Sequence, residues 1–168
     1  MFFYLLLTLL FGVSTAEAQT LPCTKSQFTI PISGITFGMS PDQVSKRLKV
    51  VLGNSKVSKI GGEFPTFLIE VSKKEGNDFD DIVLMFNKNK LYRATVSYSA
   101  EYQAREGGFK PAFLGLLKAS TNSYGMRTSV QEGTEAIIAT WGPSDSVTFQ
   151  VRGSTEKKSI ALSYICPL

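Results

Sequence analysis

Residues 34–48, which read GITFGMSPDQVSKRL, contain a complete helix start, and no other stretch restricts the fold as strongly. Ser40 has a side chain suited to an N-cap, Pro41 follows it at the first helical position, and Gln43 completes a capping box. Apolar residues then recur at positions i, i+4, i+7 and i+8 of one helical face, namely Val44, Leu48, Val51 and Leu52. The sequence therefore predicts an amphipathic helix over residues 41–52 whose apolar stripe must lie against another layer.

Alternating apolar residues predict strands in both halves of the chain. In the first half, TFLIEVS forms one predicted strand, and DIVLMFNKNKLYRATVSYS forms two strands joined by a hairpin turn at residues 87–90. In the second half, the predicted strands are EAIIATW, SVTFQVR and KSIALSYIC. A second helix is expected from near Pro111 to just before Gly125, and the polar stretch AEYQAREGG before it is expected to be a linker.

This order of elements predicts an α+β protein. Each half contains a helix followed by three antiparallel strands, so we expect two tandem α-β-β-β units, over residues 32–100 and 108–166. The second strand of the hairpin alternates apolar and polar residues, which indicates a sheet covered on one face only. We therefore expect the helices to pack on one face of the antiparallel strands. The pattern leaves open whether the two halves share one sheet or form two.

The N-terminus has the composition of an export signal. An apolar core from Phe2 to Val13 precedes Ala16-Glu17-Ala18, which has the small-x-small form of a signal peptidase site. We expect cleavage after Ala18, which makes residues 1–18 a signal peptide and residues 19–168 the mature domain. No Lys or Arg precedes the apolar core, so the alternatives are a start codon farther upstream or an uncleaved anchor.

Two cysteines, Cys23 and Cys166, lie near the ends of the expected mature domain. In an exported protein, such an even pair predicts a disulfide bond. The residues QTLP before Cys23 do not form a lipobox, which favours release without a lipid anchor. We therefore expect a periplasmic or secreted protein that meets a membrane only during export.

The charge of the chain is modest and dispersed. Its formal charge is +4, and loss of Glu17 with the leader would leave 18 bases against 13 acids (14 − 1), or +5. No run of five like charges occurs, which indicates a solvated surface and no nucleic-acid site. The hydrophobic fraction of 43% and the charged fraction of 19% are those of an ordinary globular protein and exclude a disordered chain.

The sequence lacks most of the parts that an enzyme active site needs. It contains no histidine, both cysteines are expected in a disulfide, and no G-x-S-x-G or P-loop motif occurs. A Ser-Lys dyad remains as a hydrolytic alternative, although no spacing singles one out. The acidic stretch NDFDD lacks the glycine and the distant glutamate of an EF-hand, so we interpret it as a charged turn. We expect no enzymatic activity, no metal and no cofactor.

The helix start resembles the G-x-x-x-G-M-[ST]-x-x-x-V-x-x-x-L-G opening of a superfamily of small exported proteins. That superfamily includes the small lipoprotein of the outer-membrane β-barrel assembly machine (BamE/SmpA type) and the β-lactamase inhibitor proteins. The matching residues are Gly34, Gly38, Met39, Ser40, Val44 and Leu48.

This resemblance implies an αβ repeat unit that binds other proteins and performs no chemistry. The tandem inhibitors have two such repeats and bind through the open face of the sheet. The chain differs from the assembly lipoproteins in having no lipobox and in its length, since they usually have one repeat. No functional residue is carried over, because nothing matches outside the helix start.

We therefore expect an exported, non-enzymatic protein-binding module, either an inhibitor or an envelope-assembly accessory. Its binding residues are predicted on one face of the strands and are Glu70, Met85, Arg93, Thr95, Gln150 and Arg152. Trp141, beside Gly142 and Pro143, is interpreted either as an interface anchor of this site or as a strand-end core residue. One alternative is a periplasmic small-molecule or lipid carrier, which needs an internal cavity on the order of a few hundred Å³. A Ser-Lys hydrolase is the third.

Overall fold

The computed structural model describes residues 23, 30, 32–52, 56–61, 65–70, 78–142 and 147–167. The expected signal peptide, residues 1–18, lies outside these described residues. The first elements are α1 (Pro41–Leu52), β1 (Lys56–Ile60), β2 (Thr66–Glu70), β3 (Phe79–Asn87) and β4 (Lys90–Tyr98). They are followed by α2 (Ala100–Arg105), α3 (Phe109–Tyr124), β5 (Ser129–Glu132), β6 (Ala136–Trp141), β7 (Thr148–Ser154) and β8 (Ser159–Ile165).

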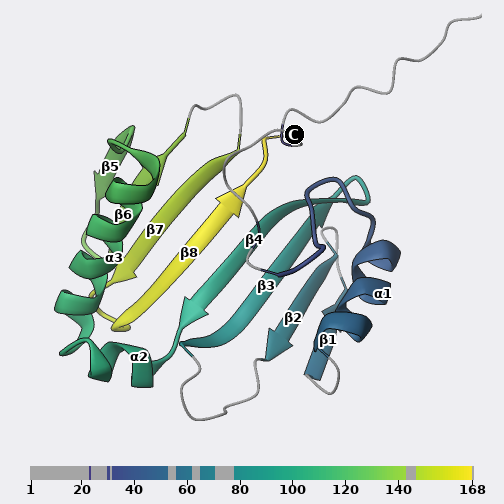
Figure 1. Ribbon diagram of the computed structural model, residues 1–168, viewed down its shortest axis with the longest axis horizontal. Helices are drawn as coiled ribbons and strands as arrows, with labels where there is room; N and C mark the ends of the chain where they lie inside the picture. The colour runs from purple at the N-terminus through teal and green to yellow at the C-terminus, as the bar shows by residue number, and fades with distance from the viewer. Residues whose placement is uncertain are drawn as a thin grey trace, which may run out of the picture.

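The eight strands of the described residues form a single antiparallel sheet (Figure 1). Their spatial order is β1-β2-β3-β4-β8-β7-β6-β5, so each half of the chain forms a meander. The two meanders join in the middle, where β4 pairs with β8 and Thr95 lies opposite Ser163. The predicted α+β class is therefore confirmed, and the two halves share one sheet.

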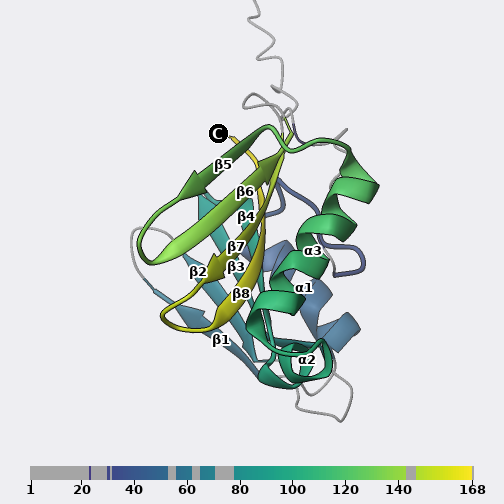
Figure 2. The same cartoon turned by 90° about the vertical axis from the view of Figure 1, so that its left-hand side faces the viewer.

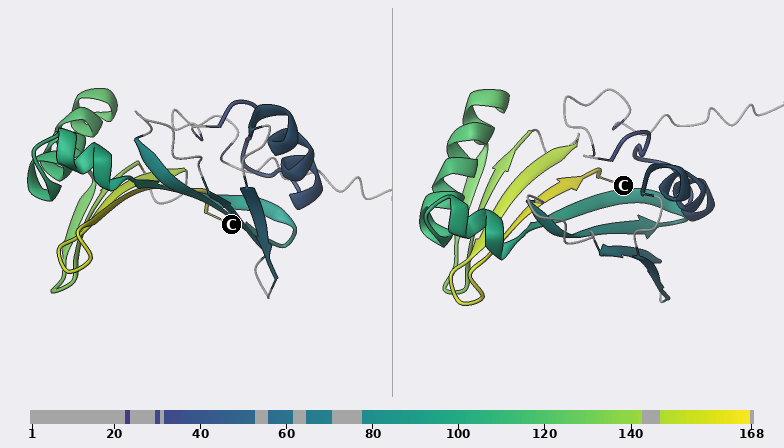
Figure 3. Two further views of the ribbon diagram at one scale, coloured as in Figure 1. Left: turned by 90° about the horizontal axis from the view of Figure 1, so that it is seen from below. Right: turned by 60° about the horizontal axis from the view of Figure 1, so that its bottom comes forward.

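The three helices of the described residues lie on the same side of this sheet (Figure 2). α1 lies over the end of the sheet that contains β1 and β2, and α2 and α3 lie over the end that contains β5 to β7 (Figures 1 and 3). In the left view of Figure 3 the two ends of the sheet bend away from the helices. The face of the sheet opposite the helices is therefore concave. The helices therefore cover one face only, as the alternation in the strands predicts.

α1 begins with the capping box that the sequence predicts. The Ser40 N–H donates to Oε1 of Gln43 at 2.8 Å, and the Gln43 N–H donates to Oγ of Ser40 at 3.3 Å. Gly38, at φ +84°, turns the chain into the helix, and its N–H donates to the Leu91 carbonyl at the start of β4 at 2.9 Å. Within the predicted apolar stripe, Val44 and Leu48 are buried, whereas Val51 is 38% exposed. Val51 therefore lies at the margin of the core, whereas Val44 and Leu48 are fully part of it.

Two strands were missing from the expected order of elements. β1 reads KVSKI and β5 reads SVQE, and each pairs along one side only, at an edge of the sheet. Every residue of β5 is exposed, so its sequence has none of the apolar alternation that identifies a half-buried strand. The expectation of three strands after each helix was therefore wrong, because short edge strands do not need a buried face.

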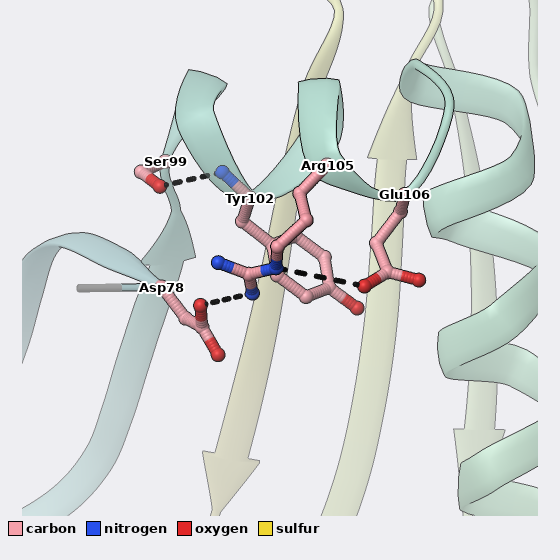
Figure 4. Close-up of polar contacts among 5 residues, drawn as sticks. All are labelled: Asp78, Ser99, Tyr102, Arg105 and Glu106. Carbon is pink, nitrogen blue, oxygen red and sulfur yellow. Dashed lines mark hydrogen bonds and ion pairs between the residues drawn. The ribbon is translucent and has the colours of Figure 1, made fainter. Parts of the chain in front are cut away.

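The stretch AEYQAREGG, predicted to be a linker, begins with the short helix α2. The Ser99 hydroxyl caps this helix by accepting a hydrogen bond from the Tyr102 N–H at 3.0 Å (Figure 4). At the other end of α2, Arg105 forms an ion pair with Asp78, just before β3, and its guanidinium carbon lies 5.5 Å from the centre of the Tyr102 ring. One capped turn and one side-chain bridge thus order a polar stretch that has no helical apolar stripe.

Three further expectations, a hairpin turn, a second helix and a disulfide, are confirmed. The β3–β4 turn places Lys88 at φ +46° and Asn89 at φ +62°, which are the conformations of a two-residue hairpin turn. The second predicted helix is α3, which ends at Gly125 with φ +81°. Cys23 and Cys166 form a disulfide with their Cα atoms 5.8 Å apart. In the part of the chain that the structure describes, no helix combines the length and hydropathy needed to span a membrane.

Candidate functional site

The concave face of the sheet carries most of the residues that the sequence predicts for binding. Because residues paired across antiparallel strands point to the same side, the registers define three rows of side chains, which we call the open face. The first row is Thr66, Met85, Arg93, Ile165 and Thr148. The second is Leu68, Val83, Thr95, Ser163, Gln150 and Thr140. The third is Glu70, Asp81, Ser97, Ala161, Arg152 and Ile138.

All six strand residues of the predicted site lie in these rows: Glu70, Met85, Arg93, Thr95, Gln150 and Arg152. They come from β2, β3, β4 and β7, so both meanders contribute to the face. The pairing of β4 with β8 brings the two contributions together in the middle of the sheet. Since the alternation within each strand predicts which residues share a side, this part of the site could be found without coordinates.

The alternate strand positions point toward the helices and form the core. Examples with buried side chains are Phe67, Ile69, Leu84, Val96, Phe149 and Val151. Gly153 in β7 belongs to the same side, where a Cβ atom would lie only 2.8 Å from the Phe113 ring of α3. This close approach shows that α3 rests directly on the sheet, and that the open face is the side that no described helix covers (Figure 3).

The open face mixes apolar, hydroxyl and charged side chains. Its apolar members are all partly buried, and they are Leu68, Val83, Met85, Ile138, Ala161 and Ile165. Two cations, Arg93 and Arg152, lie in different rows from each other, and two acids, Glu70 and Asp81, share the third row with Arg152. Surfaces that bind other proteins are enriched in arginine, and this face carries two arginines.

Arg93 occupies the middle of the first row with an incomplete set of hydrogen bonds. Its Nη2 lies 3.4 Å from the Ser163 Oγ, which is near the limit for a hydrogen bond. The Ser163 hydroxyl also bonds to the Thr95 hydroxyl, with the two oxygens 3.0 Å apart. The Arg93 Nε is buried and has no hydrogen-bond partner in the described structure. A charged group therefore sits on the concave surface, and most of its donors have no partner among the described residues.

Trp141, the seventh residue of the predicted site, does not lie on the open face. It pairs with Phe149 on the helix side of the sheet and is only 1% exposed. Its indole N–H donates to the Gly125 carbonyl at 3.1 Å, and its ring centre lies 5.7 Å from that of Phe149. The structure therefore places Trp141 among the core residues, joined to the end of α3, as the alternative interpretation of this residue expects.

The same aromatic cluster contains Tyr164, whose ring centre is 5.1 Å from that of Phe149. Burial, with a smaller contribution from Tyr124, raises the pKa of Tyr164 to about 12. Burial also raises the pKa of Tyr98, at the end of β4. Both phenols are therefore neutral near neutral pH and act as parts of the core.

The acidic stretch NDFDD, interpreted from sequence as a charged turn, is only partly a turn. β3 begins at Phe79, so Asp80 and Asp81 are strand residues, and Asp78 forms the ion pair with Arg105 (Figure 4). Among the described residues, no group of three or more Cys, Asp or Glu side chains is placed to hold a metal ion.

The structure also shows a surface depression that the sequence patterns did not identify. It has a volume of about 370 Å³ and is formed by α3, from Leu114 onward, and the loop after it. Leu114 is 52% exposed there and Met126 is 89% exposed, and Lys118 and Arg127 lie beside them. The only sequence signal is Leu114, an apolar residue outside the buried stripe of α3, and one residue predicts no site.

Comparison of the chain with known proteins found no matching family model, no matching curated protein and no matching solved structure.

Proposed function

We propose that this protein is exported and binds another protein through the open face of its sheet. The observation that carries the proposal is a concave, eight-stranded face that no described helix covers (Figure 3), with partly buried apolar side chains set among arginines and hydroxyls. A face of mixed composition that includes arginines has the features of a protein-recognition surface. An inhibitor and an envelope-assembly accessory are the two forms of this function that the helix-start resemblance implies.

The arrangement of the strands supports the idea of two tandem units. β1 to β4 follow α1, β5 to β8 follow α3, and the spatial order of the second meander is the reverse of the first. Such an order would arise if two similar units faced each other across the β4–β8 pair. In this proposal, one continuous recognition surface is built from both units, because the open face draws residues from each.

The disulfide and the expected leader are the basis for proposing export. Disulfides persist mainly in oxidising compartments such as the periplasm and the extracellular space. Cys23 and Cys166 lie 143 residues apart in sequence and tie the start of the expected mature domain to the strand at the centre of the sheet. We propose residues 1–18 as the signal peptide that directs the chain to such a compartment.

The test is a double substitution on the open face, Met85→Ala with Arg93→Ala. The purified, oxidised protein is immobilised and incubated with the exported proteins of its source organism, and bound proteins are quantified by mass spectrometry. The double variant should lose the specifically captured protein. Its melting temperature should stay within about 2 °C of the wild type, since surface changes alter stability by only about 0.5 kcal/mol.

A matched control is Leu114→Ala with Arg127→Ala, which removes one apolar and one arginine side chain from the depression on α3. This control should capture the same protein as the wild type. Equal capture by the open-face variant and the wild type would overturn the proposal. A large fall in melting temperature for Met85→Ala with Arg93→Ala would instead place these residues in the core.

A further inference from the structure

Arg93 has more hydrogen-bonding capacity than the structure uses. A guanidinium carries five N–H donors, and the described structure shows only the long bond from Nη2 to the Ser163 hydroxyl. The Nε is buried without a partner, and no described carboxylate forms an ion pair with this arginine. Arg105, by comparison, pairs with both Asp78 and Glu106 (Figure 4). Arg93 is therefore an arginine whose counter-charge is missing from the described part of the chain.

The surroundings of Arg93 favour recognition over simple solvation. Its two neighbours in the first row are Met85 and Ile165, which are both apolar and partly buried. The Thr95 and Ser163 hydroxyls lie beside it in the second row and already bond to each other. An ion pair with apolar neighbours on a concave surface is screened less by water than one on a convex, polar surface. The Arg93 guanidinium could therefore bind a negatively charged group strongly, and no such group pairs with it among the described residues.

We propose that the protein partner inserts an aspartate or glutamate side chain, flanked by apolar residues, against Arg93 in the middle of the first row of the open face. This inference rests on the proposed function, because the acid belongs to a partner bound at the same face. A carboxylate matches the planar fork of the guanidinium and accepts two parallel hydrogen bonds from it. Because Nε is covered, the donors that the carboxylate reaches are those on Nη1 and Nη2. The apolar neighbours Met85 and Ile165 pack against the residues on either side of the acid.

A free small carboxylate offers the same chemistry but gains nothing from these apolar neighbours. Phosphate groups are usually held by several cations. The two arginines of the face are not neighbours, since Arg93 is in the first row on β4 and Arg152 is in the third row on β7. The arrangement of one cation between apolar side chains therefore fits an acidic protein side chain better than an isolated anion.

The experiment uses a displayed library of short random peptides as the probe, selected on the oxidised protein. Selection on the wild type should enrich peptides that carry an aspartate or glutamate between apolar residues. Selection on Arg93→Glu should enrich lysine or arginine at that position, and selection on Arg93→Gln should remove the charge preference. Arg127→Gln is the matched control, since Arg127 lies at the α3 depression, and it should enrich the same acidic peptides as the wild type.

Affinities of the best peptide then test the pairing directly. Changing its acid to the amide should weaken binding to the wild type about tenfold or more, but binding to Arg93→Gln less than about threefold. Equal losses for both proteins would overturn the inference, and so would acidic enrichment on Arg93→Gln. Displacement of the peptide by acetate at the peptide's own concentration would also overturn it, in favour of a free carboxylate.

The outcomes separate this inference from the proposed function. One outcome is a set of peptides that bind the wild type but not the Met85→Ala variant and that carry no preferred acid. This outcome would refute the role of Arg93 but would still support the open face as a binding surface. A library that yields no peptide sensitive to Met85→Ala would count against both.

Discussion

A test of how closely α3 lies against the sheet is provided by Gly153→Ala in β7. A Cβ atom at this position would lie 2.8 Å from two ring atoms of Phe113 and 3.2 Å from the Phe109 ring. Ordinary van der Waals contact begins at 3.4 Å, so the Phe113 ring would have to withdraw by 0.6 Å (3.4 − 2.8). That ring is 5% exposed and stacks on Phe109 with the ring centres 6.0 Å apart, so both rings would have to move together.

The expected magnitude follows from two opposing effects. Overpacking a core typically costs about 1–3 kcal/mol, whereas replacing a glycine within a strand recovers about 0.5–1 kcal/mol of conformational entropy. Because the two rings are held between the helix and the sheet, we expect a net loss of about 1–2 kcal/mol for Gly153→Ala. In a domain of this size, that loss lowers the melting temperature by about 2–8 °C.

The matched control is Gly115→Ala in the interior of α3. A Cβ atom there meets no atom within 4 Å, and the residue is exposed. The same glycine-to-alanine change should therefore raise stability by about 0.5–1 kcal/mol, because alanine favours the helix. Urea denaturation of the oxidised proteins, followed by circular dichroism, measures both. If Gly153→Ala is as stable as the wild type or more stable, α3 does not contact β7 as described.

Three further predictions test the helix cap, the disulfide and the buried tyrosines. Ser40→Ala should lower the free energy of unfolding by about 1 kcal/mol at an unchanged m-value, and an unchanged urea midpoint would show that the capping box contributes nothing. The disulfide closes a loop of 143 residues, so its reduction should cost up to about 5 kcal/mol on the chain-entropy model. Thiol titration of the oxidised, denatured protein should find no free cysteine, and two reactive thiols would contradict the bond. The pKa of Tyr164 is raised to about 12 by burial, so its contribution to stability is complete below pH 10 and declines as pH rises toward about 12. The decline is about 1.4 kcal/mol per pH unit for this residue, and Tyr164→Phe should remove it from the measured pH dependence; the same slope in the variant would contradict the assignment.

Local sequence alone determined the elements that form from neighbouring residues. Ser40 and Gln43 cap each other within one helical turn, and Lys88 and Asn89 complete a two-residue turn, so α1 and the β3–β4 hairpin were predicted with their limits nearly correct. Alternation along each strand also predicted that Met85, Arg93 and Gln150 share a side, since successive side chains point to opposite faces. The binding role of these residues stays a prediction.

Only the tertiary structure decided the features that depend on residues far apart in the chain. The pairing of β4 with β8 makes one sheet out of two meanders, and no periodicity within either strand specifies its partner. β1 and β5 gain their hydrogen bonds from neighbouring strands without burying a face of their own, so their sequences carried no signal. The burial of Trp141, and the lack of a described partner for the Arg93 Nε, likewise depend on which elements lie nearby. Local patterns report on helices and strands because backbone geometry is local, whereas contacts between strands and helices are set by the whole fold.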